Sequence, residues 1–338
     1  MSVAKIHYFL VTILLSLILS IVVGVRDLSI GTDTYAYADF FIKQNVDSIS
    51  DNRYEPLFKY LTLSIKLLTD DVSVYFSIVF ILFNVMLLYT TYLYVNYVKN
   101  IDLSTIYFSA GIFLFSSWYM VATVNGIRNG LALPFLYLSI FLLVEKRWFL
   151  FLAFFIISTQ FHYSTVLYLP FLALIFTKDK ALMFFFLTSA IFYPLGFNEK
   201  IVKVMSDLSG LGLYESIKYY GLDVVSYYGF NSIQYIYSFG LGVIFYLSSF
   251  FVVKERKDKY FKLVKIYILL ISPYFFFGFG GFSNRFAFGA WLYAPVLYVV
   301  FINNVRNRFI SDNFYIFSSV CVFVLGLTDY FFRIHPLE

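Results

Sequence analysis

The sequence predicts an all-α polytopic membrane protein. Hydrophobic residues make up 61% of the 338 residues and charged residues only 13%, whereas a soluble domain carries roughly 25% charged residues. The apolar residues form solid blocks of about 15 to 26 residues, long enough to cross or nearly cross a hydrocarbon core. Strands of a membrane β-barrel would instead alternate in polarity over about 10 residues.

The first apolar block follows Lys5 and covers residues 6–25. It is longer than the apolar part of a secretory signal, it lacks a small-x-small cleavage pattern before Arg26, and further blocks follow it. We therefore expect an uncleaved first helix. Eleven spans are predicted in all: 6–25, 73–98, 103–122, 124–144, 148–161, 163–177, 181–197, 232–253, 262–280, 286–302 and 313–331.

Two stretches carry regular charges and are predicted to be outer loops, at 26–72 and 198–231. Within the first, residues 56–68 are apolar but short, and Lys59 and Lys66 interrupt them. An interfacial or re-entrant helix is the expected structure there, and a spanning helix would reverse every later orientation. No long-period repeat or second soluble domain is present, so residues 1–338 are predicted to form one integral membrane domain.

The orientation follows from the basic residues of the short loops. The segment from Lys254 to Lys259 contains four basic residues, Lys254, Arg256, Lys257 and Lys259. Basic loops stay in the cytoplasm, so this segment is predicted to lie inside. The amino terminus then lies inside and the carboxyl terminus outside.

This topology gathers most of the informative polar residues on the outer face. They are three arginines, one histidine and two carboxylates: Arg26, Arg128, Arg285, His162, Asp33 and Glu55. Ionisable residues at the edge of hydrocarbon are costly and usually face a cavity or a partner. Simpler interpretations remain open, because Arg26 can anchor at the head groups and Asp33 can cap a turn. Their joint placement favours a site.

Several classes of site are not supported by the sequence. Cys321 is the only cysteine, so an intramolecular disulfide and a cysteine-based metal site are excluded. No glycine-rich phosphate loop or dinucleotide motif occurs. The net charge of +5 is a topology signal in a membrane protein, and nucleic-acid binding is not expected.

The same polar segments carry a family resemblance. They read, in order, Arg26-Asp27 with Gly31-Thr-Asp-Thr-Tyr35, Glu55-Pro-Leu-Phe58, Asn125-Gly-Ile-Arg-Asn-Gly-Leu-Ala132, Phe161-His-Tyr-Ser164 with Leu169-Pro170, and Ser283-Asn-Arg285. This order resembles the EpsG family of polysaccharide polymerases, relatives of the Wzy O-antigen polymerases. Many relatives have Gln after the central arginine, where this chain has Asn129.

The resemblance implies a multi-pass enzyme of the bacterial inner membrane with a GT-C-like glycosyltransferase architecture and its active site on the periplasmic face. Such a polymerase moves a growing glycan from undecaprenyl diphosphate onto the non-reducing end of a new lipid-linked repeat unit. A chain-length co-polymerase and a flippase are expected partners, besides the lipid-linked donor and acceptor and membrane lipid.

The candidate residues suit this chemistry. Arginine binds phosphate oxygens through a planar fork, so Arg26, Arg128 and Arg285 are candidate ligands of the diphosphate. The acceptor hydroxyl needs a base or an orienting acceptor, and the choice among His162, Asp33 and Glu55 stays open. Sugar contacts are expected from the side chains of Tyr35, Tyr54, Tyr163 and Asn129.

No cofactor is predicted. Arginine side chains, and not a metal ion, are expected to neutralise the charge of the diphosphate. An O-antigen ligase shares the fold and the arginine chemistry and remains an alternative, as does a flippase for lipid-linked oligosaccharide. A flippase would be expected to show internal pseudo-symmetry and charges along the depth of its spans. A membrane O-acyltransferase would place its histidine deep in a tunnel, which His162 in an outer hairpin matches poorly.

Overall fold

Helices make up nearly all of the regular structure, as the apolar blocks predict. The computed structural model describes residues 3–45, 54–100, 111–113, 116–210, 212–219 and 229–305. In these ranges the one β-type pairing is an isolated bridge between Val252 and Val305. The described chain divides into two compact units, one reaching to Val166 and the other beginning at Leu167.

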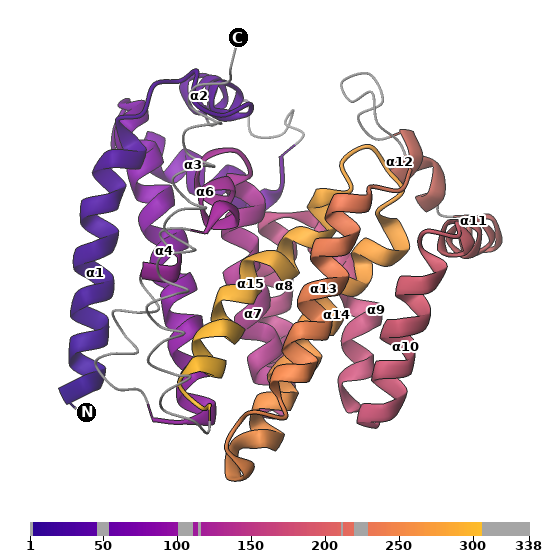
Figure 1. The fold of residues 1–338 in the computed structure, drawn as a ribbon. Coiled ribbons are helices and arrows are strands. Elements are labelled where there is room, and N and C mark those ends of the chain that lie inside the picture. The colour runs from indigo at the N-terminus through magenta and orange to yellow at the C-terminus, as the bar shows by residue number, and fades with distance from the viewer. Residues whose placement is uncertain are drawn as a thin grey trace. The chain divides into compact units, whose positions relative to one another are not determined.

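The first unit is built on a pair of long helices and a helical hairpin (Figure 1). Its helices are α1 (Val3–Gly24), α2 (Thr34–Lys43), α3 (Pro56–Lys66), α4 (Val72–Val98), α6 (Ser117–Val124), α7 (Ile127–Val144) and α8 (Trp148–Phe161). Helix α1 lies along α4, where Asn84 Nδ2 donates to Ser16 Oγ at 2.8 Å. In the α7–α8 hairpin, Ser158 Oγ donates to the Ala132 carbonyl at 2.8 Å.

The second unit surrounds two deeply buried helices, α14 and α15. Its elements are α9 (Leu169–Leu172), η3 (Ala173–Phe176), α10 (Asp179–Phe192), α11 (Phe197–Ser209), α12 (Leu213–Tyr219), α13 (Ser232–Ser248), η4 (Lys254–Arg256), α14 (Lys257–Phe277) and α15 (Asn284–Ile302). The buried indole of Trp291 on α15 donates to Ser238 Oγ at 3.0 Å. A short 3-10 helix, η2 (Tyr163–Tyr168), runs across the boundary of the two units.

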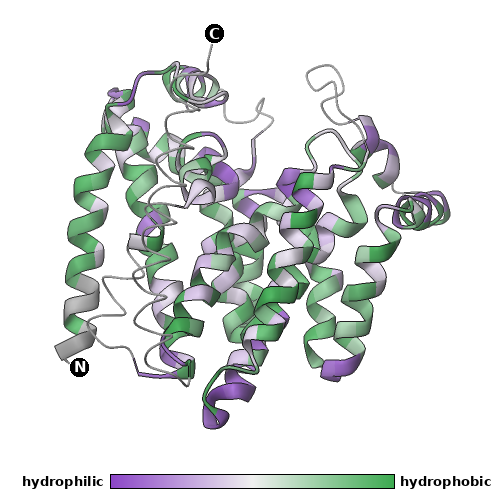
Figure 2. Cartoon of the chain, in the orientation of Figure 1, coloured by the Kyte–Doolittle hydropathy of each residue, from purple (hydrophilic) through white to green (hydrophobic). Residues whose placement is uncertain are grey.

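Four helices of the described chain are long and apolar enough to cross a membrane: Val72–Val98, Ile127–Val144, Lys254–Phe277 and Asn284–Ile302. Figure 2 shows the apolar colouring along α1 and α4. Many apolar side chains of α1 are exposed, among them Leu14, Ile18 and Ile21. Burial in a core does not explain this exposed stripe, whereas contact with lipid does.

Other predicted spans are shorter or more broken than the sequence suggests. The block 148–161 is helix α8, but 14 residues rise only about 21 Å. The block 163–177 is divided between η2, α9 and η3. The block 181–197 bends by 98° and continues as α11, so up to five spans result if the bent pair counts as one. The count of eleven stays a prediction.

Some predicted segments lie partly or wholly outside the described residues, and others have a different structure or different bounds. The span 313–331 lies outside the described residues, and so does half of 103–122; its described parts are residues 111–113 and 116–122, and residues 117–122 belong to α6. The predicted span 232–253 ends its helix at Ser248. Helix α3 lies within the predicted segment 56–68. The stretch 198–231, predicted as a loop, holds most of α11 and all of α12.

Candidate functional site

Three helix ends of the first unit position the principal polar residues. Glu55 precedes Pro56, the first residue of α3, and has the extended backbone that a following proline favours. Arg128 is the second residue of α7. His162 follows the last residue of α8 in an extended conformation. The local sequence therefore places each of these side chains at one end of a helix and not in its middle.

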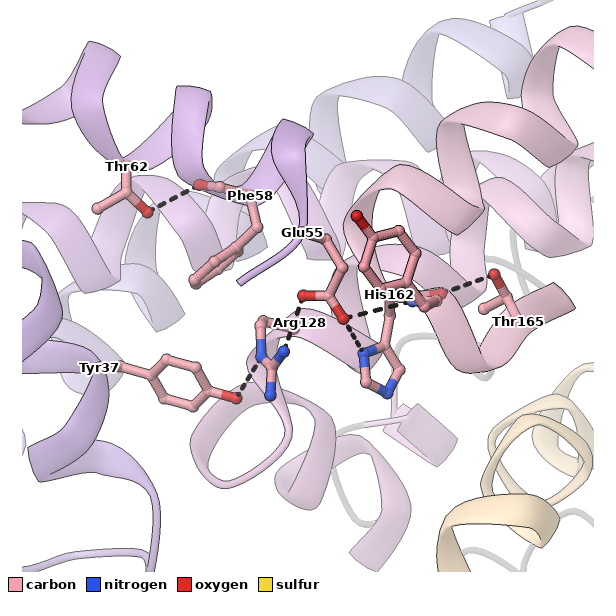
Figure 3. A network of polar contacts seen from close by, with 8 residues as sticks. Tyr37, Glu55, Phe58, Thr62, Arg128, His162 and Thr165 are labelled. Carbon is pink, nitrogen blue, oxygen red and sulfur yellow. Dashed lines mark hydrogen bonds and ion pairs between the residues drawn. The ribbon is translucent and has the colours of Figure 1, made fainter. Parts of the chain in front are cut away.

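The carboxylate of Glu55 joins these ends into one cluster (Figure 3). Its Oε2 lies 2.7 Å from Arg128 Nη1, and its Oε1 lies 2.9 Å from His162 Nδ1. The backbone N–H of Tyr163 also donates to Oε1, at 3.3 Å. Both carboxylate oxygens thus have partners, and segments 73 and 107 residues apart in sequence meet at one group.

Aromatic side chains hold the guanidinium of Arg128 in place. The guanidinium lies over the ring of Tyr54, with 4.7 Å between Cζ and the ring centroid. Its Nε donates to the hydroxyl of Tyr37 at 3.4 Å, a long hydrogen bond. Phe58 in turn packs edge-on against Tyr37. Stacking and hydrogen bonding together fix both the plane and the rotation of the guanidinium.

Electrostatics keep Glu55 ionised although its side chain is only 4% exposed. Burial opposes ionisation, but the hydrogen bonds and charges of His162 and Arg128 outweigh it and lower the pKa of Glu55 to about 2. Burial also raises the pKa of Tyr37, so its phenol stays neutral. A carboxylate with so low a pKa is a weak base, and it is better suited to orient a neighbouring group than to accept a proton.

Asn125 fixes the loop between α1 and α2 beside the start of α7. Its side-chain oxygen accepts from the backbone N–H of Thr32 at 2.9 Å. Gly31 has φ +92°, and a Cβ there would collide with this same oxygen. Gly31 and Asn125 belong to two of the sequence motifs that carry the family resemblance, and both are needed for this one contact.

The remaining candidates have partners other than the Glu55 carboxylate or lie in the other unit. Arg26 stacks on Phe76 at 4.0 Å and donates through Nη1 to the Val23 carbonyl. Burial lowers the pKa of Arg26 to about 10, so it stays charged at neutral pH. Asp33 precedes α2 without capping it through its side chain. Arg285, in the second unit, lies over the ring of Phe282 at 4.2 Å.

The four predicted sugar contacts differ in their surroundings. Tyr54 lies in the cluster, and Tyr163 contributes its backbone N–H while its side chain is exposed. Tyr35 is exposed on α2, and Asn129 is buried in α7. Exposure suits a ring that stacks on a sugar, whereas a buried amide does not reach solvent.

Tyr37 is the residue of the cluster that sequence reasoning missed. It lies on the buried face of α2 with Thr34, Ala38 and Phe41, a helical spacing visible in the sequence. The signal is weak because the chain contains 31 tyrosines. The described part of the chain contains no group of three or more His, Cys, Asp or Glu side chains that could hold a metal ion.

Comparison with known proteins gives one match. The sequence profile of the EpsG family matches residues 9–336, nearly the whole chain. No curated protein and no solved structure matches the chain.

Proposed function

The chain belongs to the EpsG family, a Wzy-type polymerase-like family, and from this we propose that it polymerises lipid-linked oligosaccharide repeat units. The enzyme would transfer the growing glycan from undecaprenyl diphosphate to the non-reducing end of an incoming repeat unit, on the outer face of the bacterial inner membrane. We retain eleven spans and a GT-C-like architecture as part of this proposal.

The reaction exchanges one bond at the donor sugar. The acceptor hydroxyl oxygen forms a bond to the anomeric carbon, and the bond from that carbon to the diphosphate oxygen breaks. Undecaprenyl diphosphate leaves with the electron pair, and the acceptor hydroxyl gives up its proton. The reaction therefore needs a base at the acceptor and positive charge near the leaving phosphates.

His162 is the residue that we assign as the base. Its Nδ1 is bonded to ionised Glu55 at 2.9 Å, which favours the tautomer with the proton on Nδ1. Proton exchange with the acceptor would then proceed through Nε2. Glu55 acts as a positioning residue in this scheme, since a carboxylate with a pKa of about 2 binds a proton too weakly to serve as the base.

Arg128 is the residue that we assign to the leaving diphosphate. Glu55 engages Nη1 and Tyr37 engages Nε, and neither of these two contacts uses Nη2. We assign Nη2 to a phosphate oxygen. Arg285 stays a phosphate ligand predicted from the sequence alone, and Tyr35, Tyr54 and Tyr163 are proposed as sugar contacts. Arg26 is retained as a further candidate phosphate ligand, because its Nε and Nη2 are buried donors without a partner among the described residues.

The Glu55 carboxylate shared by Arg128 and His162 is the observation that carries this proposal, and it supplies the test. A strain lacking the gene would be complemented with wild type, Glu55→Gln or His162→Ala at matched membrane expression. The length distribution of the surface polysaccharide would be read on a gel. Exposed Glu145, in the α7–α8 turn, provides the matched control Glu145→Gln.

Loss of the polymer ladder, with a single repeat unit still reaching the surface, is expected for both site variants and not for the control. Loss of the single unit as well would point to a ligase or a flippase. An unchanged ladder in both site variants would overturn the assignment of this cluster to the reaction.

A further inference from the structure

Helix α11 leaves an apolar helix at nearly a right angle. Helix α10 and helix α11 are bent by 98° across a short break (Figure 1). The break contains Pro194, which cannot continue the hydrogen-bond ladder, and Gly196 with φ +70°. The turn is therefore specified by the sequence.

Three distinct faces run along α11. The first is exposed and apolar, and at 100° per residue its members fall within about a third of the circumference: Phe197, Ile201, Val204, Met205 and Leu208. The second is charged and lies on the side away from the first: Glu199, Lys200, Lys203 and Asp207. The third is buried between them: Asn198, Val202 and Ser206.

The buried face fixes the rotation of α11 about its own axis. Asn198 Nδ2 donates to the carbonyls of Ser189 on α10 and Phe275 on α14, at 2.8 and 2.9 Å. Ser206 Oγ accepts from the backbone N–H of Tyr214 on α12 at 3.0 Å. Because three elements hold this face, the apolar face has a set direction that does not depend on what covers it.

Helix α10, which precedes the bend, also has an exposed apolar surface. On α10 and the break that follows it, Phe184, Leu187, Ile191 and Leu195 are exposed at helical spacing. Leu208 at the far end of α11 is 83% exposed. In a chain with several span-length apolar helices, lipid is the solvent that such side chains require.

We infer that α11 is an amphipathic helix that lies in the plane of the bilayer, with its apolar face in the acyl region and its charged face in water. A broken span is disfavoured, because it would carry four charged side chains into hydrocarbon. The two acidic and two basic side chains cancel, so insertion would depend on the apolar face and not on anionic lipids. This inference does not depend on the polymerase activity.

Nitroxide scanning tests the inference on the full-length protein in nanodiscs of a neutral lipid. Cys321→Ser would supply the background, because Cys321 is the only cysteine. Single cysteines would replace Val204, Met205 and Leu208 on the apolar face, and Lys200, Lys203 and Asp207 on the charged face. Phe184, 72% exposed on α10, provides the lipid-facing reference.

Collision rates with oxygen and with a polar nickel complex distinguish the possible environments. We expect oxygen to dominate at the apolar positions and at Phe184, and the nickel complex to dominate at the charged positions. Nickel access at all six positions would place α11 in water and overturn the inference. Protection from both reagents at the apolar positions would mean that protein covers them, either another segment of this chain or a second copy, and would also overturn it.

Discussion

Arg128 combines three contacts that only a guanidinium can make at once. It reaches Glu55 Oε2 and the Tyr37 hydroxyl while its plane lies over Tyr54. A lysine ammonium keeps the positive charge, but it is a single nitrogen and has no flat face. The chemistry of this position therefore depends on shape as well as charge.

Replacing Arg128 by lysine is accordingly expected to lower polymer formation by at least about tenfold, which corresponds to about 1.4 kcal/mol of transition-state stabilisation. The ladder assay with matched membrane expression measures the effect. Arg147→Lys in the exposed α7–α8 turn is the control. Near-normal activity of the Arg128 variant would show that this residue contributes only its positive charge.

The pKa of Glu55 predicts how stability depends on pH. The folded pKa of about 2 lies below the reference value of 4.5, so the ionised carboxylate stabilises the folded state above about pH 4.5. This contribution is lost as the pH falls toward 2. We expect Glu55→Gln to lower stability at pH 7 by about 3 kcal/mol, because it leaves buried partners without their anion.

Thermal unfolding in detergent at pH 7, 5 and 3 measures this effect against Glu145→Gln. The difference in stability between wild type and Glu55→Gln should be fully present at pH 5 and should narrow at pH 3. A difference that is the same at all three values would contradict the ionised state of Glu55.

At the scale of elements, α6 and α7 approach each other closely at Gly130. A Cβ at this position would collide with the backbone carbonyl oxygen of Ala122. Gly130 lies two residues after Arg128 on α7. The separation of these two helices therefore controls where the guanidinium lies.

Gly130→Ala is expected to destabilise the protein by about 2 kcal/mol through overpacking and to weaken polymer formation with it. Gly240→Ala on α13 is the matched control, because a Cβ there meets nothing within 4 Å. In a helix interior that change should be neutral or stabilise by up to about 1 kcal/mol. Thermal unfolding measures the stability of both variants. Equal stability of Gly130→Ala and Gly240→Ala would refute the close approach of α6 and α7.

The sequence predicts some elements better than others. Solid apolar blocks identified the helices α4, α7, α14 and α15, because their length and composition alone satisfy a bilayer. The bend after α10 was missed because residues 181–197 carry no charge and were taken as one span, although Pro194 and Gly196 interrupt them. That bend depends on the positive φ of Gly196 and on the two tertiary hydrogen bonds of Asn198.

The candidate site was predicted as a set of residues and not as a geometry. Glu55, Arg128 and His162 were recognised because charges are rare in this chain, where only 13% of residues are charged. Their shared carboxylate contact depends on the packing of α3 against α8 and could not be derived from spacing. Tyr37 was missed because one tyrosine among 31 carries little information.

At the scale of the whole molecule, the orientation in the membrane is the property on which an outer-face site depends. The basic segment around Lys257 predicts a cytoplasmic position, and the first loop an outer one. Asp39 lies on α2 with its side chain 40% exposed. In the predicted topology these two positions lie on opposite sides of the membrane.

A cysteine at Asp39 is expected to react with a membrane-impermeant thiol reagent in cells whose inner membrane is intact, and a cysteine at Lys257 is not. Both would be made in the Cys321→Ser background, and cells with a permeabilised inner membrane would show that each thiol is reactive. The opposite labelling pattern would reverse the orientation and place the Glu55 cluster on the cytoplasmic side.

The wide sequence separation within the Glu55 cluster also constrains how the protein is made. A ribosome that has just delivered Glu55 to the membrane must add 107 more residues before His162 exists. Moving an unpaired carboxylate out of water costs free energy. The segment that begins α3 is therefore expected to stay at the aqueous surface during synthesis. We therefore expect its burial to be a late step of biogenesis that follows insertion of the α7–α8 hairpin.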